Sequence, residues 1–245
     1  MNADFVQGVI AQLPTLRPWR KIFGESAARD EQGMDALVHI IDDDESIRAA
    51  LDSLFRSVGM ATRLHRSAQE FLDADRPDVP SCLVLDVRLP GISGLDFQER
   101  LAQLKINVPI VFITGHGDIP MSVRGMKAGA VDFLTKPFRD QDMLDAVGAA
   151  IEKDSERRQG ERNIADVRKR YATLSARERQ VMTLVTAGKM NKQVAGLLNL
   201  SEITVKVHRG RAMRKMGART LAELVRMASH LQLPTENALV DSTSV

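Results

Sequence analysis

The pattern of apolar residues changes at Leu37, where short apolar runs begin to alternate with stretches of helical spacing. Short apolar runs are typical of buried strands, and apolar residues three and four apart are typical of amphipathic helices. The predicted strands are Val38–Ile41, Ala61–His65, Cys82–Leu85, Pro109–Ile113 and Val131–Leu134. The predicted helices are Ser46–Val58, a short one around Phe71, Gly94–Leu104, Met121–Ala128 and one beginning near Asp140. This alternation predicts an α/β domain with a five-stranded doubly wound parallel sheet.

The last part of the chain shows helical spacing only. Ser175 and Glu178 form a capping-box pattern at the start of one helix, which stops at Gly188. Further helices are predicted at Lys192–Leu198, Thr204–Met216 with its start at Ser201, and Thr220–Leu231. A short helix, a tight turn and a basic helix are the arrangement of a helix-turn-helix. We therefore expect a small all-α domain behind the α/β domain.

The chain divides into segments at 1–35, 36–151, 152–171, 172–233 and 234–245. The α/β domain is 36–151 and the helical domain is 172–233, followed by a tail. The stretch 152–171 is rich in charge, with one glycine and no proline, which favours a helical linker; a flexible linker is the alternative. The extension 1–35 receives no function. Met34 lies just before the first strand and is an alternative start of the protein.

The net charge of +2 is the sum of an acidic and a basic region of the chain. From Ala36 to Ala150 there are about 17 acidic and about 12 basic residues, whereas Tyr171–Leu233 holds about 3 acidic and about 11 basic ones. Metal or phosphate chemistry suits the first region and nucleic acid suits the second. The single Cys82 offers no disulfide, and no apolar stretch has membrane-spanning length. We expect a cytoplasmic protein without a membrane partner.

Polar residues follow four of the predicted strands. They are Asp42, Asp43 and Asp44 after the first strand, Asp86 after the third, Thr114 after the fourth and Lys136 after the fifth. Parallel strands bring these ends to one edge of the sheet, where ligands and reacting groups gather. Clustered carboxylates repel one another and suit a hard cation such as Mg²⁺. The same set, with a lysine and a hydroxyl, suits phosphoryl transfer to a carboxylate nucleophile.

These residues resemble the receiver domain of two-component response regulators, from about Leu37 to about Ile151. The resemblance implies that Asp86 is the phospho-acceptor. It also implies a Mg²⁺ site formed by Asp42, Asp43, Asp86 and the backbone carbonyl of Arg88. Lys136 would hold the phosphoryl oxygens and would precede Pro137 through a cis bond, while Thr114 and Phe133 match the switch pair of the family.

The helical region resembles the LuxR-type DNA-binding domain, on the motifs Leu174–Glu178, Thr204–Arg209 and Arg214–Met216. Together with a receiver, this arrangement is similar to response regulators of the FixJ/NarL class, and the loop Thr114–Asp118 is nearest to the FixJ-like branch. The resemblance implies that Lys206 and Val207 face base edges. The implied phosphate contacts are Lys192, Thr204, His208, Arg209 and Lys215. Gly210 departs from many relatives and reads no base.

The resemblance implies a phosphorylation-dependent transcriptional regulator and not an enzyme. A histidine kinase would phosphorylate Asp86, and the receivers would then form a homodimer that binds double-stranded DNA, with RNA polymerase as a further candidate partner. One alternative is a regulator that binds DNA without phosphorylation. A phosphatase with an aspartyl-phosphate intermediate is disfavoured, because the second acid that such enzymes place two residues after the nucleophile is here Arg88.

Overall fold

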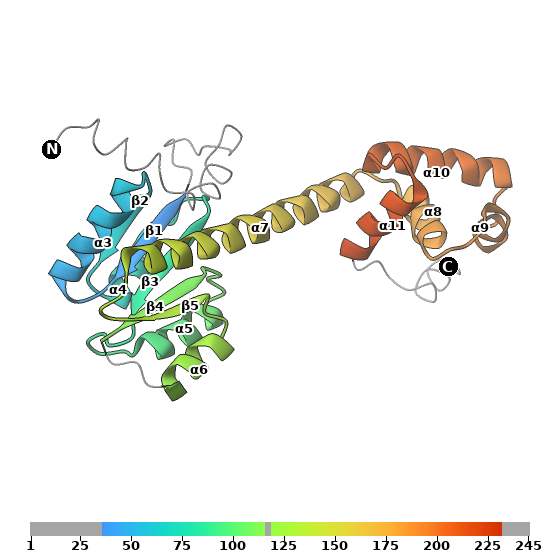
Figure 1. Ribbon diagram of the computed structural model, residues 1–245. Coiled ribbons are helices and arrows are strands. Elements are labelled where there is room, and N and C mark those ends of the chain that lie inside the picture. Colours follow the sequence, from blue (N-terminus) through green and yellow to red (C-terminus); the bar gives the residue numbers. More distant parts are fainter. Residues whose placement is uncertain (1–35, 116–118, 232–245) are drawn as a thin grey trace. The chain divides into compact units, whose positions relative to one another are not determined.

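The computed structural model describes residues 36–115 and 119–231. The predicted extension 1–35, the tail 234–245 and the loop residues 116–118 lie outside the described residues. The chain divides into two compact units, Met1–Arg158 and Gln159–Val245. Figure 1 labels the helices and strands of both units.

Five parallel strands form the sheet of the first unit, in the order β2-β1-β3-β4-β5. They are β1 (Leu37–Ile41), β2 (Ala61–His65), β3 (Ser81–Asp86), β4 (Ile110–Thr114) and β5 (Asp132–Thr135). Every residue of β1, β3 and β4 is buried, as expected for strands covered on both faces, which is why their sequences are continuous apolar runs. The predicted doubly wound sheet is confirmed.

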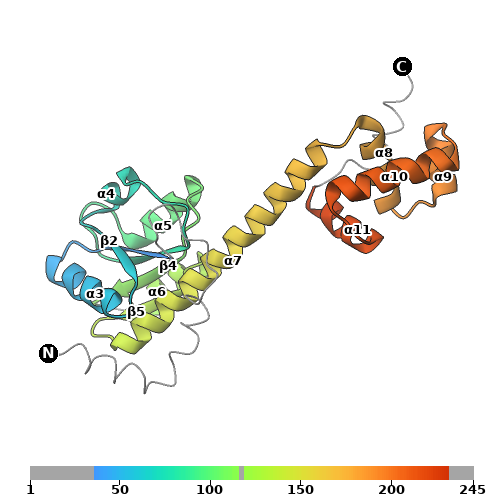
Figure 2. The ribbon, with the colours of Figure 1, turned by 90° about the horizontal axis from the view of Figure 1, so that it is seen from above.

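Helices cover both faces of this sheet (Figure 2). They are α3 (Glu45–Ser57), α4 (Ala68–Asp73), α5 (Gly94–Gln103), α6 (Ile119–Lys127) and α7 (Asp140–Ala172). Phe55 of α3 and Met143 of α7 belong to one core cluster, together with Val84 of the sheet. Phe71 of α4 and Phe97 of α5 belong to a separate cluster. The sheet is therefore enclosed between two apolar layers, so a ligand can reach it only at its edges.

The strand register brings the predicted polar residues to one edge of the sheet. Ile41 of β1 lies beside Leu85 of β3, so the next residues along the two strands, Asp42 and Asp86, are neighbours. From β1 the chain crosses to β2 on one side and then to β3 on the other, which makes this edge a topological switch point. Crevices for ligands form at such points, beyond the carboxyl ends of the strands.

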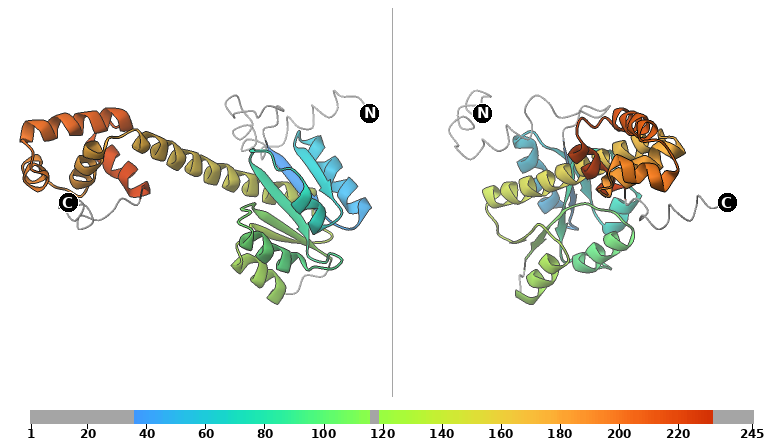
Figure 3. Two further views of the ribbon diagram at one scale, coloured as in Figure 1. Left: turned by 180° about the vertical axis from the view of Figure 1, so that it is seen from behind. Right: turned by 90° about the vertical axis from the view of Figure 1, so that its right-hand side faces the viewer.

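Helix α7 contains 33 residues and runs without a break through the predicted linker 152–171 (Figure 3). The helical interpretation of this stretch is confirmed, and the boundary between the two units falls inside the helix, after Arg158. Asp154 is 1% exposed and accepts a hydrogen bond from the Ser81 amide at 2.9 Å. Ion pairs of 2.6 Å to Arg157 and Arg158 also hold its carboxylate. These contacts fix this part of α7 on the first unit.

The second unit is built from α8 (Ala176–Thr186), α9 (Asn191–Leu198), α10 (Glu202–Met216) and α11 (Leu221–His230), besides the end of α7. The predicted capping box of Ser175 and Glu178 starts α8. Asn199, at φ 53°, turns the chain between α9 and α10, and Ser201 caps α10 by accepting a hydrogen bond from the Thr204 amide. None of the helices in the described ranges combines the length and apolar character that a membrane span requires.

Most element ends differ from the predictions by one or two residues. The predicted helix 121–128 begins two residues earlier, at Ile119, and includes Pro120. Proline fits the first turn of a helix because its missing N–H has no partner to bind there. The helix can therefore begin before Pro120 instead of after it.

Two buried histidines lie side by side on β1 and β2. The Nδ1 atom of His39 is 3.1 Å from the Nε2 atom of His65, and both rings meet Phe71 edge-on. Burial, followed by the charges of His65, Arg63 and Arg76, lowers the pKa of His39 from 6.5 to about 3. Burial also lowers the pKa of His65, to about 4. Both rings therefore remain neutral in the folded protein at neutral pH.

We predict that the first unit loses stability in mild acid. Below about pH 6.5 the unfolded chain binds protons on both histidines, whereas the folded chain binds them only near pH 4 and below. Stability is therefore complete above about pH 6.5, and each histidine removes about 2 kcal/mol of unfolding free energy between about pH 7 and pH 5. Urea denaturation at these two pH values measures the loss. His65→Leu should lose about half as much, and a wild type with equal stability at both pH values would contradict the prediction.

Candidate functional site

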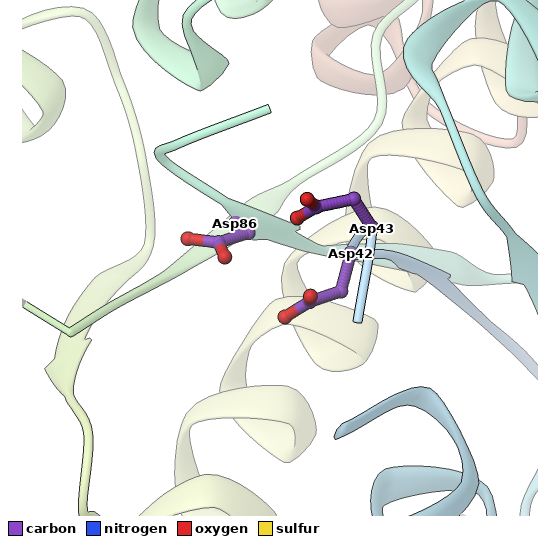
Figure 4. Close-up of side chains that lie close together, drawn as sticks. All are labelled: Asp42, Asp43 and Asp86. Carbon is purple, nitrogen blue, oxygen red and sulfur yellow. The ribbon is translucent and has the colours of Figure 1, made fainter. Parts of the chain in front are cut away.

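Three carboxylates meet at the carboxyl edge of the sheet (Figure 4). Asp42 and Asp43 directly follow β1, and Asp86 ends β3. One ligand oxygen from each of the three side chains lies within 4.8 Å of those from the other two. Asp42 is fully buried, Asp86 is 8% exposed and Asp43 is exposed to solvent. The cluster therefore has one solvent-facing acid and two that are largely removed from water.

Lys136 bridges the two buried carboxylates. Its Nζ atom lies 2.7 Å from Oδ2 of Asp42 and 3.1 Å from Oδ2 of Asp86. The backbone places it there, because Lys136 follows β5 and its amide donates to the Thr114 carbonyl at 2.7 Å. The bond from Lys136 to Pro137 is cis, as the resemblance implied.

Burial and the charges of this cluster shift the pKa of Asp42 and of Lys136. Burial raises the pKa of Asp42 above its ordinary value, although the hydrogen bond from Lys136 acts in the opposite direction. Burial alone would lower the pKa of Lys136, but hydrogen bonds and charges from Asp42 and Asp86 raise it. Lys136 therefore stays cationic and supplies one positive charge against three acids.

The donor set fits Mg²⁺. All three side chains offer hard carboxylate oxygens, which this ion prefers. With Lys136 as the one cation in contact with them in the described part of the chain, ionised acids leave a net charge of about −2. A divalent cation balances that charge. Arg88 directly follows the cluster, and its amide donates to Oδ1 of Asp86 at 3.2 Å, while the role of its carbonyl stays a prediction.

Two residues missed by the sequence analysis position the acids. Arg48 is buried, and its Nη1 atom donates to the carbonyl of Asp42 at 2.6 Å. A Cβ atom at Gly94 would lie 2.5 Å from the Asp86 carbonyl oxygen, so only glycine fits against this backbone. Gly94 follows Ser93, which caps α5, and this turn pattern could have pointed to it. Asp44 is the N-cap of α3, where its side chain accepts a hydrogen bond from the Ser46 amide, and it does not belong to the cluster.

The residues of the predicted switch pair lie on neighbouring strands. Thr114 ends β4, is fully buried and lies opposite Thr135 of β5. Phe133 is two positions before Thr135, so Phe133 and Thr135 point to the same face of the sheet, as does Thr114 opposite Thr135. The Phe133 ring is half-buried, with its centroid 5.8 Å from that of Phe112. Thr114 directly follows Ile113, the residue opposite Asp86, so it stands at the same edge of the sheet, and Phe133 lies farther from this edge.

The predicted DNA contacts lie mostly on α10 of the second unit. Val205, Ala212 and Met216 face its core and Met213 packs partly buried against it, whereas the other positions of the helix are exposed or half-buried. The exposed members of the predicted set are Lys192, Lys206, Val207 and Lys215, and the half-buried ones are Thr204, His208 and Arg209. A Cβ atom at Gly210 would meet nothing within 4 Å. Except for Lys192 on α9, the set belongs to one basic helix.

Known proteins match both units. Residues 38–148 match the response regulator receiver domain, and residues 172–228 match the bacterial regulatory proteins of the luxR family. Nodulation protein W of Bradyrhizobium diazoefficiens is 56% identical over 213 residues, which cover 87% of this chain and 92% of that protein. Transcriptional regulatory protein FixJ of Rhizobium meliloti is 47% identical over 195 residues, or 79% of this chain and 95% of that protein.

The chain belongs to the FixJ-like transcriptional response regulators. Its function is phosphorylation-dependent regulation of transcription, carried by a receiver and a LuxR-type DNA-binding domain. A solved structure of the response regulator StyR supports the fold, with a TM-score of 0.71 and 46% identity over 80% of this chain and 98% of that one.

Lys215 of this response regulator has partners inside its own domain. Its Nζ atom lies 2.6 Å from Oε2 of Glu178 and 3.2 Å from the Thr173 carbonyl oxygen. Glu178 is 3% exposed, and the hydrogen bonds from Lys215 and the Ser175 amide lower its pKa. The contact of Lys215 with a DNA phosphate stays a prediction, but the lysine also has a structural role that its sequence motif did not reveal.

We predict that Lys215→Met destabilises the DNA-binding domain. The substitution leaves the carboxylate of buried Glu178 without its cation, which costs about 1–3 kcal/mol of unfolding free energy. Lys206→Met is a matched control, because Lys206 lies on the same helix and forms no hydrogen bond or ion pair within the described ranges. Urea denaturation of both variants is the measurement, and equal stabilities would refute the structural role.

Proposed function

We propose that Asp86 accepts a phosphoryl group from a histidine kinase. The observation that supports this proposal is that Lys136 bridges two largely buried carboxylates, those of Asp42 and Asp86. A third acid, Asp43, lies close enough to them for all three to bind one metal ion. Asp42 is fully buried, and Asp43 is exposed and suited to a metal ion rather than to covalent chemistry. Asp86 lies at the end of the central strand β3 with limited exposure, so an incoming phosphoryl group can reach it.

In this reaction one carboxylate oxygen of Asp86 attacks the phosphorus of a phosphohistidine. The phosphorus–nitrogen bond breaks, and the leaving ring nitrogen takes up a proton. Asp42, Asp43, Asp86 and the carbonyl of Arg88 would hold Mg²⁺, which supplies positive charge against the phosphoryl oxygens. Lys136 would supply a second positive charge, from its place beside Oδ2 of Asp86.

The phosphoryl group then alters the packing of the receiver. It brings about one extra negative charge and several acceptor oxygens to the edge of the sheet. The hydroxyl of Thr114 lies at that edge and moves toward these oxygens. The movement makes room for Phe133 on the same face of the sheet, because the two side chains are close neighbours on β4 and β5. A local charge is thereby converted into a change of the receiver surface.

The altered receivers pair, and pairing couples two DNA-binding domains to adjacent half-sites. In each domain α10 enters the major groove, where Lys206 and Val207 meet base edges. The phosphate contacts are Lys192, Thr204, His208, Arg209 and Lys215. DNA is the partner of the basic domain and a histidine kinase is the partner of the receiver, with RNA polymerase as a further partner at the promoter. These partners place the protein in the cytoplasm, where it acts without catalytic turnover.

We predict that Asp86→Asn abolishes phosphorylation by a small phosphodonor, because the substituted amide is not a nucleophile. Intact-mass spectrometry after treatment with acetyl phosphate and Mg²⁺ counts phosphoryl groups on each variant. The wild type should gain one group and become more dimeric in light scattering. Asp78→Asn is the control, because Asp78 is an exposed acid of the same domain that pairs with Arg158. Labelling of Asp86→Asn at the wild-type level would exclude this acceptor.

Two substitutions on α10 should separate base reading from phosphate binding. Arg209→Ala should weaken binding to all DNA sequences and reduce the slope of affinity against salt by about one ion. Lys206→Ala should instead relax the preference for the specific site. Fluorescence anisotropy with specific and scrambled duplexes at several salt concentrations tests both. If Lys206→Ala weakened both duplexes equally, Lys206 would be a phosphate contact.

A further inference from the structure

Helix α6 follows β4, the strand that carries Thr114. Of the receiver helices, it has the fewest buried residues. Gly125 is its one buried residue and Met121 packs partly buried against the core, whereas Ile119, Val123 and Met126 expose large apolar side chains. Burial of an apolar face is what normally holds a short helix on a domain. The contacts at Gly125 and at the end of α6 are therefore especially important in holding this helix on the domain.

The carboxyl-terminal end of α6 is held by a side chain from α5, which lies beside it (Figure 1). Gln98 is 6% exposed, and its Nε2 atom lies 3.2 Å from the Ala128 carbonyl and 3.4 Å from the Gly125 carbonyl. The Gly125 carbonyl also accepts a hydrogen bond from the Ala130 amide at 3.1 Å, whereas the Ala128 carbonyl lies just past the end of the helix, where a donor from outside takes the place of an intrahelical partner. Gln98 thus caps α6 from a neighbouring helix, about 30 residues away in sequence.

Close packing reinforces this contact. A Cβ atom at Gly125 would lie 3.2 Å from the side chain of Leu95 and 3.3 Å from the ring of Phe112, so glycine lets α6 approach the domain closely. Phe112 is also the neighbour of Phe133, the aromatic member of the switch pair. The end of α6 therefore rests on the same aromatic side chain against which Phe133 packs.

A second connection between α5 and α6 is of a different kind. Arg124 lies 3.1 Å from Asp96 and 2.8 Å from Glu99, and all three side chains are more than half exposed. Ion pairs in water contribute little to stability, about 0–1 kcal/mol. The buried hydrogen bonds of Gln98 are therefore the stronger link between the two helices.

We propose that Gln98 fixes the carboxyl-terminal end of α6 as the pivot about which this helix moves when Asp86 is phosphorylated. The proposal rests on the phosphorylation switch described above and adds a positioning residue to it. Thr114 lies just before α6 in the chain, so its movement is applied to the amino-terminal end of the helix. Gln98 and the Gly125 contact keep the other end in place, and the exposed apolar face of α6 turns as a unit.

Hydrogen–deuterium exchange of the full chain, with and without acetyl phosphate and Mg²⁺, tests the pivot. In the wild type, phosphorylation should change exchange in residues 119–124 and leave residues 126–130 within about twofold. Gln98→Met keeps the length of the side chain but removes both donors. It should speed exchange of residues 126–130 about tenfold in both states, which corresponds to about 1.4 kcal/mol for the two lost hydrogen bonds. Phosphorylation-driven dimerisation, measured by light scattering, should weaken in the same variant.

Arg124→Gln is the matched control, because it removes both exposed ion pairs between the same two helices and should leave exchange of residues 126–130 unchanged. Exchange at wild-type rates in Gln98→Met, or equal changes at both ends of α6 in the phosphorylated wild type, would overturn the pivot. Mass spectrometry of the same samples reports labelling of Asp86. Labelling without these exchange patterns overturns the pivot alone, whereas absence of labelling overturns the phosphorylation switch together with it.

Discussion

Repulsion among carboxylates at the edge of the sheet is the constraint on which the receiver depends. The strand order puts β1 beside β3, and the register then forces Asp42 and Asp86 together. Lys136 lies between them and offsets one of the negative charges, which leaves the cluster short of positive charge. A divalent cation is the addition that such a site favours, because the opposite charges are already in place.

The same edge borders the outer part of the sheet. Thr114 ends the strand next to β3, and Phe133 lies on the last strand, opposite Phe112 and two residues before the partner of Thr114. Within the described residues, the DNA-binding domain carries no such cluster. It is a small apolar core with one basic helix on its surface, and its internal polar contact between Glu178 and Lys215 serves stability. Control and recognition are thus assigned to domains of opposite charge.

Much of this could be predicted from the sequence, because it depends on local patterns. Buried strands such as Cys82–Leu85 are continuous apolar runs, and parallel strands place their polar ends at one edge whatever the details of packing. The contacts that were missed join residues through tertiary packing. The pairing of Lys215 with Glu178 spans 37 residues, and the hydrogen bond of Arg48 depends on how α3 folds back over β1. Neither leaves a periodic signal in the sequence.

The charge balance at Asp42, Asp86 and Lys136 is tested most directly by titrating Mg²⁺ into the protein in a calorimeter. If Lys136 competes with the ion for the two buried carboxylates, Lys136→Met should bind Mg²⁺ more tightly than the wild type. Asp42→Asn should bind it at least about tenfold more weakly, since a charged ligand is lost. Weaker binding by Lys136→Met, or equal binding by all three proteins, would contradict the account of this site.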